Sequence, residues 1–252
     1  MIKSKFRLIV DGILIPFIVY FGVTMFVAFL YGVVNAIMHR EVEINTIFIQ
    51  GIADGCVVFA LLPLYMIFKN KYDIKFTKIS VKNILYTIPL AFSVCIICNI
   101  FIQLMPSAAD NVVSKEIVKM TESYNIWVSL LMVSIFVPIV EELLFRGFFY
   151  DVVDILKGPI AAMVITSIAF GIAHLNLEQG IYGLIAGGFL SYIRYKFNNL
   201  SYTVVMHLFM NFCSLIFIKP ILELGGLREM SFVIFICVAI IVLTLYRINF
   251  KK

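Results

Sequence analysis

Long apolar runs separated by short polar breaks follow one another along the whole chain. A helix needs about 17–25 mainly apolar residues to cross a bilayer, and eight runs approach or reach that length. The predicted helices cover residues 12–35, 46–68, 84–105, 126–155, 159–175, 179–197, 200–219 and 231–248. Since no linker rich in Pro, Gly and Ser divides them, we expect residues 1–252 to form one membrane domain. The predicted fold class is all-α, a polytopic bundle of about eight transmembrane helices.

Composition and charge support this interpretation. Hydrophobic residues make up 62% of the chain and charged residues 14%, whereas soluble domains are about half apolar and a quarter charged. With a cytoplasmic N-terminus, eight spans place 15 of the 20 Lys and Arg residues on the inner side, as the positive-inside rule requires. The other five are Arg40, Lys115, Lys119, Lys219 and Arg228. We therefore expect a multi-pass protein of the cell membrane with both termini cytoplasmic, and no nucleic-acid partner.

Three predicted spans carry polar side chains that lipid would penalise. The residues concerned are Glu141, Glu142, Arg146, His174, His207 and Asn211. Ionisable residues within a membrane span usually face the interior of the bundle and mark a functional site. Two of these side chains, His207 and Asn211, lie four residues apart and project together, and Phe170 shares a helix face with His174 in the same way. We expect the three helices to bring these groups together.

Spacing along the predicted fourth helix separates the two glutamates. Glu142 and Arg146 are four residues apart and can pair, whereas Glu141 lies about 100° further round the helix and points elsewhere. Depth adds a second constraint, because His174 lies about 21–24 Å from the inner end of its helix. A fourth helix that ended at Arg146 would leave Glu141 only about 8 Å from the inner surface. We therefore predict that this helix continues to about Ile155 and that Arg146 lies deep within the membrane.

Other polar and small residues in the spans have a structural interpretation. Asp54 is a lone acid in the second span, beside Gly51 and Gly55, which favours a role in helix packing. Small-residue packing is also expected for Gly180, Gly183, Gly187 and Gly188, although these glycines would also let a substrate strand approach. The five cysteines lie in apolar segments, and we interpret them as small apolar residues.

The polar residues fit a hydrolase. A carboxylate with a neighbouring imidazole can take a proton from water and later donate it, and a second imidazole with an amide can hold a developing oxyanion. Zinc is the alternative, because two histidines and a glutamate are plausible ligands. However, the sequence has no H-E-x-x-H motif, and the remaining histidine, His39, is predicted on the outer face. We therefore expect no metal and no other cofactor.

Three motifs carry a family resemblance. They are E-E-L-L-F-R (141–146), F-G-I-A-H (170–174) and H-L-F-M-N (207–211). Their order, spacing and transmembrane setting resemble the E-E-x-x-x-R, F-x-x-x-H and H-x-x-x-N/D motifs of the CAAX-protease and bacteriocin-processing family, also called CPBP or Abi. The resemblance covers about residues 125–215, the expected catalytic core, and no motif residue departs from the pattern.

The resemblance implies a role for each motif residue. Glu141 corresponds to the glutamate that activates water with the help of His174, and His207 and Asn211 correspond to the oxyanion hole. Supporting roles fall to Glu142, Arg146 and Phe170. The implied function is an intramembrane endopeptidase acting on membrane-associated peptides or proteins, in peptide maturation or bacteriocin self-immunity. A non-catalytic immunity or regulatory membrane protein is the alternative, and a proton-relay transporter is a third class that no repeat between the two halves supports.

Overall fold

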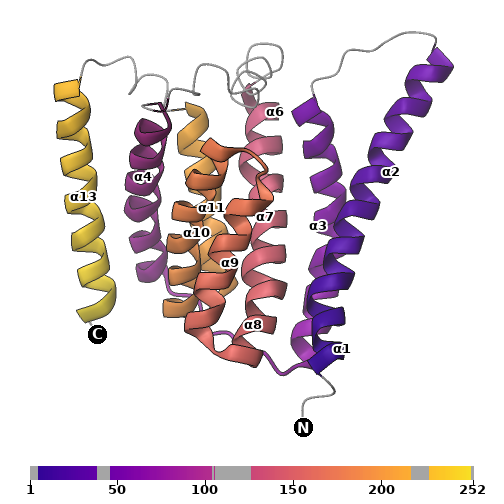
Figure 1. The fold of residues 1–252 in the computed structure, drawn as a ribbon, viewed down its shortest axis with the longest axis horizontal. Helices are drawn as coiled ribbons and strands as arrows, with labels where there is room; N and C mark the ends of the chain where they lie inside the picture. Colours follow the sequence, from indigo (N-terminus) through magenta and orange to yellow (C-terminus); the bar gives the residue numbers. More distant parts are fainter. Residues whose placement is uncertain (1–4, 39–45, 104, 106–125, 217–226, 251–252) are drawn as a thin grey trace. The chain divides into compact units, whose positions relative to one another are not determined.

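Eight helical stretches make up the part of the chain that the structure, a computed structural model, describes: residues 5–38, 46–103, 105, 126–216 and 227–250 (Figure 1). The elements are α1 (Lys5–Ile9), η1 (Val10–Leu14), α2 (Ile15–Met38), α3 (Thr46–Lys71), α4 (Val81–Gln103), α6 (Ile126–Leu131), η3 (Met132–Phe136), α7 (Val137–Glu142), η4 (Leu143–Phe149), α8 (Tyr150–Lys157), α9 (Pro159–Ala173), α10 (Leu177–Phe197), α11 (Leu200–Ile216) and α13 (Leu227–Phe250). Each predicted span corresponds to one stretch, and the described residues contain no strand. The all-α prediction is confirmed.

Length and apolar character identify the helices able to cross a membrane. Four of the described helices meet both conditions: Lys5–Ile37, Phe48–Lys71, Val81–Ile102 and Glu229–Phe250. Two more, Pro159–Ala173 and Leu200–Ile216, are apolar but shorter. Large apolar side chains remain exposed along these helices, for example Phe29, Phe59 and Phe235, as expected where the surrounding solvent is lipid.

Local sequence explains where the motif-bearing helices begin and end. Gly158 takes a positive φ of 87°, which glycine tolerates, and Pro159 then starts α9 without losing a helical hydrogen bond. Asn176 caps α10, its side-chain oxygen accepting a hydrogen bond from the Gln179 backbone N at 3.2 Å. The same helix ends at Asn198, which has a left-handed conformation. The Asn176 cap makes the connection between α9 and α10 short, since α9 ends at Ala173 and α10 begins at Leu177.

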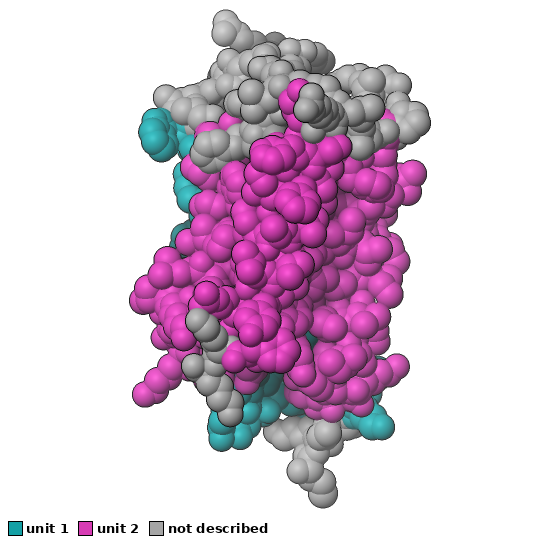
Figure 2. Space-filling view, turned by 90° about the vertical axis from the view of Figure 1, so that its left-hand side faces the viewer, with its two compact units in different colours: residues 1–75, 111–152 teal, residues 76–110, 153–252 magenta. Residues whose placement is uncertain are grey.

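The chain forms two compact units, coloured separately in Figure 2. Unit 1 consists of residues 1–75 and 111–152, and unit 2 of residues 76–110 and 153–252. Each unit therefore combines segments that are distant in the sequence. The single domain expected from the sequence stays a prediction.

Unit 1 is built on close packing between α3 and residues 126–152 of the continuous helix Ile126–Lys157, here called the 126–157 helix. A Cβ added to Gly51 would lie 2.6 Å from the Met132 Cβ, so glycine is required at this crossing. Further along, the rings of Tyr65 and Phe148 meet edge to face at 4.9 Å, and the Tyr65 hydroxyl donates to Asp151 at 2.6 Å. Residue numbers rise together on both sides, so the two helices run in the same direction.

Unit 2 has its own apolar core between α4, α10 and α11. Fully buried residues of this core include Leu90, Cys95, Ala186, Leu190, Tyr202, Met206 and Met210. All five cysteines are free thiols, and the four in unit 2 are buried. The Cys95 Sγ lies 3.1 Å from the Ser214 Oγ, which gives the thiol a polar contact inside the core. Their interpretation as apolar packing residues is confirmed.

Candidate functional site

The E-E-x-x-x-R motif lies on the 126–157 helix in unit 1. This helix passes Arg146 without a break and ends at Lys157, so the predicted continuation is confirmed. Glu142 is the last residue of α7, and Arg146 lies in the π-helical segment η4. Single π-helical turns inside α-helices are frequent at functional sites. The motif therefore coincides with a local change in helical pitch that the sequence pattern did not predict.

Glu142 and Arg146 form the predicted ion pair. The Arg146 Nη1 donates to the Glu142 Oε1 at 2.8 Å, and both side chains are 0% exposed. A buried charge is costly unless it is paired, so each residue requires the other. Glu141 is only partly buried, and its charge also interacts with that of Arg146. The predicted pairing of Glu142 with Arg146 is confirmed, and where Glu141 points stays a prediction.

His174, at the C-terminal cap of α9 in unit 2, has a defined ring orientation. Its Nδ1 lies 2.7 Å from the Phe170 carbonyl oxygen. Because a carbonyl oxygen only accepts hydrogen bonds, this contact places a hydrogen on Nδ1. In the neutral imidazole Nε2 is then the atom that can accept a proton. One turn of helix thus fixes the orientation of the His174 ring.

Phe170 brings the two histidines into one cluster. Its ring meets that of His174 at 4.8 Å and that of His207 at 5.8 Å, both at 88°. Such edge-to-face contacts are favourable and directional. His207, on α11, is 4% exposed, and the partly buried Asn211 follows it by one turn. The second and third motifs therefore come together within unit 2.

Glycines set the close approach of α9 and α10. A Cβ on Gly171 would lie 2.8 Å from the Gly180 carbonyl oxygen, which confirms small-residue packing for Gly180. At Gly188 the packing prediction was wrong, since a Cβ there would meet nothing within 4 Å. A Cβ on Gly183 would lie 3.0 Å from both Cε1 and Nδ1 of His174. The absent side chain of Gly183 therefore makes room for the imidazole. The sequence indicated a packing glycine here but did not indicate which side chain it accommodates.

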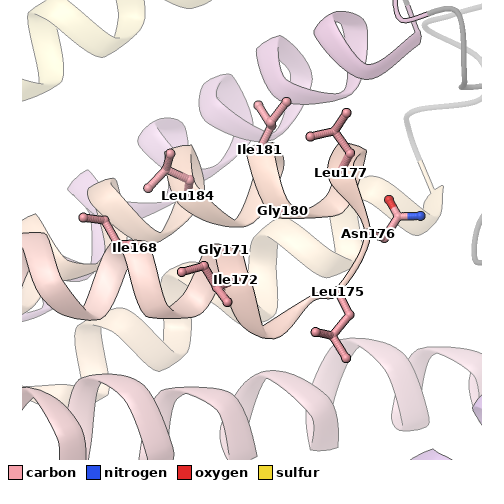
Figure 3. Close-up of a pocket in the computed structure, with 9 residues that line it drawn as sticks. All are labelled: Ile168, Gly171, Ile172, Leu175, Asn176, Leu177, Gly180, Ile181 and Leu184. Carbon is pink, nitrogen blue, oxygen red and sulfur yellow. The ribbon is translucent and has the colours of Figure 1, made fainter.

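A shallow apolar pocket of about 320 Å³ lies on the same hairpin (Figure 3). Ile168, Ile172 and Leu175 line it from α9 and the following turn, and Leu177, Ile181 and Leu184 line it from α10. The His174 ring instead packs on Gly183 and Phe170. The pocket and the histidine cluster therefore use different faces of the hairpin, and the pocket is not the candidate active site.

The predicted site residues thus form two groups. Glu141, Glu142 and Arg146 belong to unit 1, whereas Phe170, His174, His207 and Asn211 belong to unit 2. The convergence of the two groups into one site stays a prediction. Within the described residues, no group of three or more His, Cys, Asp or Glu side chains is arranged to hold a metal ion. The expectation of a metal-free mechanism also stays a prediction.

Comparison with known families adds an independent observation. Residues 123–213 match the family model described as type II CAAX prenyl endopeptidase, Rce1-like. This segment includes all three motifs. Searches of curated proteins and of solved structures each gave no match. The matched segment carries these motif residues in an all-α protein with helices apolar and long enough to cross a membrane. Residues 123–213 are thus similar to the Rce1-like CAAX proteases, and the rest of the chain has no match in this comparison.

Proposed function

We propose that the protein is an intramembrane endopeptidase that hydrolyses membrane-associated peptides or proteins with water activated by Glu141. The observation that carries this proposal is the complete set of motif residues inside the segment that matches the protease family. The orientation of His174 adds support, since its Nε2 is left to accept a proton. The matched family is described by its action on CAAX prenyl proteins; for this chain we propose membrane-associated peptides more generally.

In the proposed reaction Glu141 takes a proton from water, and the water oxygen bonds to the carbonyl carbon of the scissile peptide. His174 assists this transfer. The carbonyl oxygen becomes an oxyanion, which His207 and the Asn211 amide stabilise by donating hydrogen bonds. Breaking the C–N bond then releases an amine, which receives the proton that Glu141 took up. The Glu142–Arg146 pair, one turn of the same helix, has a structural and positioning role next to Glu141.

No metal is needed in this scheme, and we propose that none is used. Zinc is the alternative, with Glu141 and the two histidines as ligands. The two schemes differ in one simple measurement. A chelator leaves a glutamate-based reaction unchanged, whereas it abolishes a zinc-based one, and added zinc then restores activity.

We further propose that the protein crosses the cell membrane several times with both termini in the cytoplasm. The excess of Lys and Arg on one side supports this orientation. Fusions of alkaline phosphatase and of a fluorescent protein to the C-terminus test it. We expect an inactive phosphatase and a fluorescent reporter, and the opposite pair of results would contradict the proposed orientation.

The main test compares the purified wild type with Glu141→Gln on a mixture of apolar and signal-derived peptides, with cuts identified by mass spectrometry. Loss of a general base is expected to lower cleavage by about 10²–10⁴-fold. Asp151→Asn is the matched control, since Asp151 is a buried acid of the same helix that accepts a hydrogen bond from Tyr65. Full cleavage by Glu141→Gln would overturn the glutamate mechanism.

Peptide maturation and bacteriocin self-immunity are the biological roles that we propose for this activity. A non-catalytic immunity or regulatory protein is the competing function, and a cellular assay separates the two. Glu141→Gln should abolish the cellular role of an enzyme, whereas a binding protein would retain it at equal expression.

A further inference from the structure

The contact between α4 and α11 in unit 2 contains a small group of polar side chains. The two helices lie beside each other (Figure 1). Cys95 and Asn99, one turn apart on α4, both meet Ser214 of α11. The Cys95 Sγ lies 3.1 Å from the Ser214 Oγ, and the Asn99 Nδ2 donates to the same oxygen at 3.3 Å. Hydrogen bonds of this kind between membrane helices stabilise one relative position of the helices.

The hydrogen atoms of this polar group form a chain with one direction. The Asn99 amide has two hydrogens, and it donates one to the Cys95 carbonyl oxygen at 2.8 Å and the other to the Ser214 Oγ. The Cys95 thiol donates to the Met210 carbonyl oxygen at 3.4 Å. Since this uses the thiol hydrogen, the Ser214 hydroxyl donates to the Cys95 Sγ. The chain therefore runs from Asn99 through Ser214 and Cys95 to the Met210 carbonyl.

Both points at which this chain reaches α11 lie on the turn that carries Asn211. Met210 precedes Asn211 and Ser214 follows it by three residues, so the two contacts bracket Asn211. Cys95 and Met210 are 0% exposed, so solvent does not compete for these contacts. Through them α4 fixes the rotation of this turn and its position along the helix axis.

Such a restraint matters for the role proposed for Asn211. A donor of an oxyanion hole must lie about 2.7–3.1 Å from the oxyanion. A displacement of about 1 Å can cost 10²-fold in rate. A side chain on one turn of a helix keeps this position only if the turn itself is held. The contacts from α4 supply that support for the turn of Asn211.

We propose that Asn99 and Cys95 are positioning residues for the oxyanion hole: through the Ser214 hydroxyl and the Met210 carbonyl they fix the turn of α11 that carries Asn211. The effect on catalysis rests on the proposed protease function. The restraint on α11 does not, and it can be measured in protein that has no known substrate.

The first test is amide hydrogen exchange in detergent, followed by mass spectrometry. Ser214→Ala removes the hydroxyl that joins the two side chains of α4. We expect the amides of residues 211–216 to exchange about three- to tenfold faster, as the loss of one hydrogen bond predicts, with residues 200–206 unchanged. Equal exchange of residues 211–216 in this variant and the wild type would overturn the proposal.

Two further variants control this measurement. Ser214→Thr keeps the hydroxyl and should exchange like the wild type. Ser201→Ala removes a partly buried hydroxyl near the start of the same helix and should leave residues 211–216 unchanged. If Ser201→Ala speeds their exchange as much as Ser214→Ala, the restraint does not come from α4 and the proposal is overturned.

The second test is kinetic and uses a peptide that the wild type cleaves. We expect Ser214→Ala to lower kcat about tenfold with KM unchanged, because an oxyanion forms only in the transition state. In a protein that already carries Asn211→Ala, the same substitution should lower kcat no further, since the group that it positions is absent. A purely structural role would lower kcat by the same factor in both backgrounds, which would overturn the proposal.

The two tests separate this proposal from the proposed protease function. If hydrogen exchange changes as expected and the wild type cleaves no peptide, the restraint by α4 stands and the protease proposal is the one that fails. Asn99→Leu covers the case in which Ser214→Ala does not fold. It keeps the approximate size of the side chain and removes the amide at the start of the chain. We expect the same faster exchange of residues 211–216, and unchanged exchange would overturn the proposal.

Discussion

The two groups of motif residues are held in place by different physics. In unit 1 the E-E-x-x-x-R motif is fixed by charge, because Glu142 and Arg146 pair at 2.8 Å with no exposure to solvent. In unit 2 the histidine cluster is fixed by shape, because Phe170 and Gly183 surround the His174 ring. We therefore expect substitutions that remove a charge to disrupt the Glu142–Arg146 group most. Substitutions that change side-chain size should disrupt the histidine cluster most.

The largest expected effect is the loss of the buried ion pair. Arg146→Met leaves the Glu142 carboxylate buried without its cation, which costs about 3–5 kcal/mol of stability. The double variant with Glu142→Gln should cost less than Arg146→Met alone, since no unpaired charge remains. Thermal unfolding in detergent measures both.

An exposed ion pair of the same unit is the matched control. Lys75 and Asp73 approach to 3.3 Å, but both side chains are 82% exposed. Exposed pairs contribute little, so Lys75→Met should leave the Tm unchanged. If Arg146→Met is as harmless as Lys75→Met, charge does not hold the first group and the comparison fails.

The next effect concerns the space that Gly183 leaves for His174. Gly183→Ala adds a Cβ at 3.0 Å from the imidazole, so the ring must shift by a few tenths of an ångström. Misplacing a catalytic group by about 1 Å can cost 10²-fold in rate; for the smaller shift here, and with His174 in the proposed role, we expect a loss of kcat of about tenfold. The stability change should be below about 1 kcal/mol.

Gly188 on the same helix provides the control. A Cβ there meets nothing within 4 Å, so Gly188→Ala should retain full activity and gain up to about 1 kcal/mol from helix propensity. Equal activity of the two alanine variants would show that Gly183 does not position His174.

Much of the fold could be predicted from the sequence because apolar runs and helix length are local properties. All eight stretches occur where the runs predicted them, with ends shifted by several residues. The i, i+4 spacing predicted the Glu142–Arg146 pair, and the depth of His174 predicted that the helix continues past Arg146. These inferences needed only the geometry of one helix at a time.

The features that the sequence did not indicate depend on which helices are neighbours. The sequence led us to expect that the motif helices bring their polar groups together, but the spacing within α9 indicates only the Phe170–His174 face and not the contact of Phe170 with His207 on α11. Asp54 was interpreted as a lone acid, but the Gln50 Nε2, one turn earlier on α3, donates to its Oδ1 at 3.1 Å. The contact of Gln50 with the Tyr20 hydroxyl oxygen at 3.4 Å depends on the packing of α2 against α3. The π-helical segments η3 and η4 lie within the 126–157 helix and were not indicated by its apolar pattern.

A smaller effect is expected from Phe170, whose ring contacts both imidazoles. Phe170→Leu keeps the apolar character and removes the two edge-to-face contacts, which are worth about 0.5–1.5 kcal/mol beyond burial. We expect a loss of stability of that order and a decrease in kcat smaller than that of Gly183→Ala. Ile172→Leu, an exposed position on α9, is the control and should change neither quantity.

The smallest effect is expected from an uncharged hydrogen-bonding group of unit 2 that lies away from the histidines. The Tyr202 hydroxyl accepts a hydrogen bond from the Ser80 backbone N at 2.6 Å and donates to the Lys78 carbonyl oxygen at 3.3 Å. Tyr202→Phe removes both and should cost about 0.5–1.5 kcal/mol, well below the cost of the buried ion pair. Activity should be unchanged, because the phenyl ring still fills the core where α11 begins. If Tyr202→Phe lowers kcat as much as Gly183→Ala, the histidine cluster depends on the fold of the whole unit rather than on local shape.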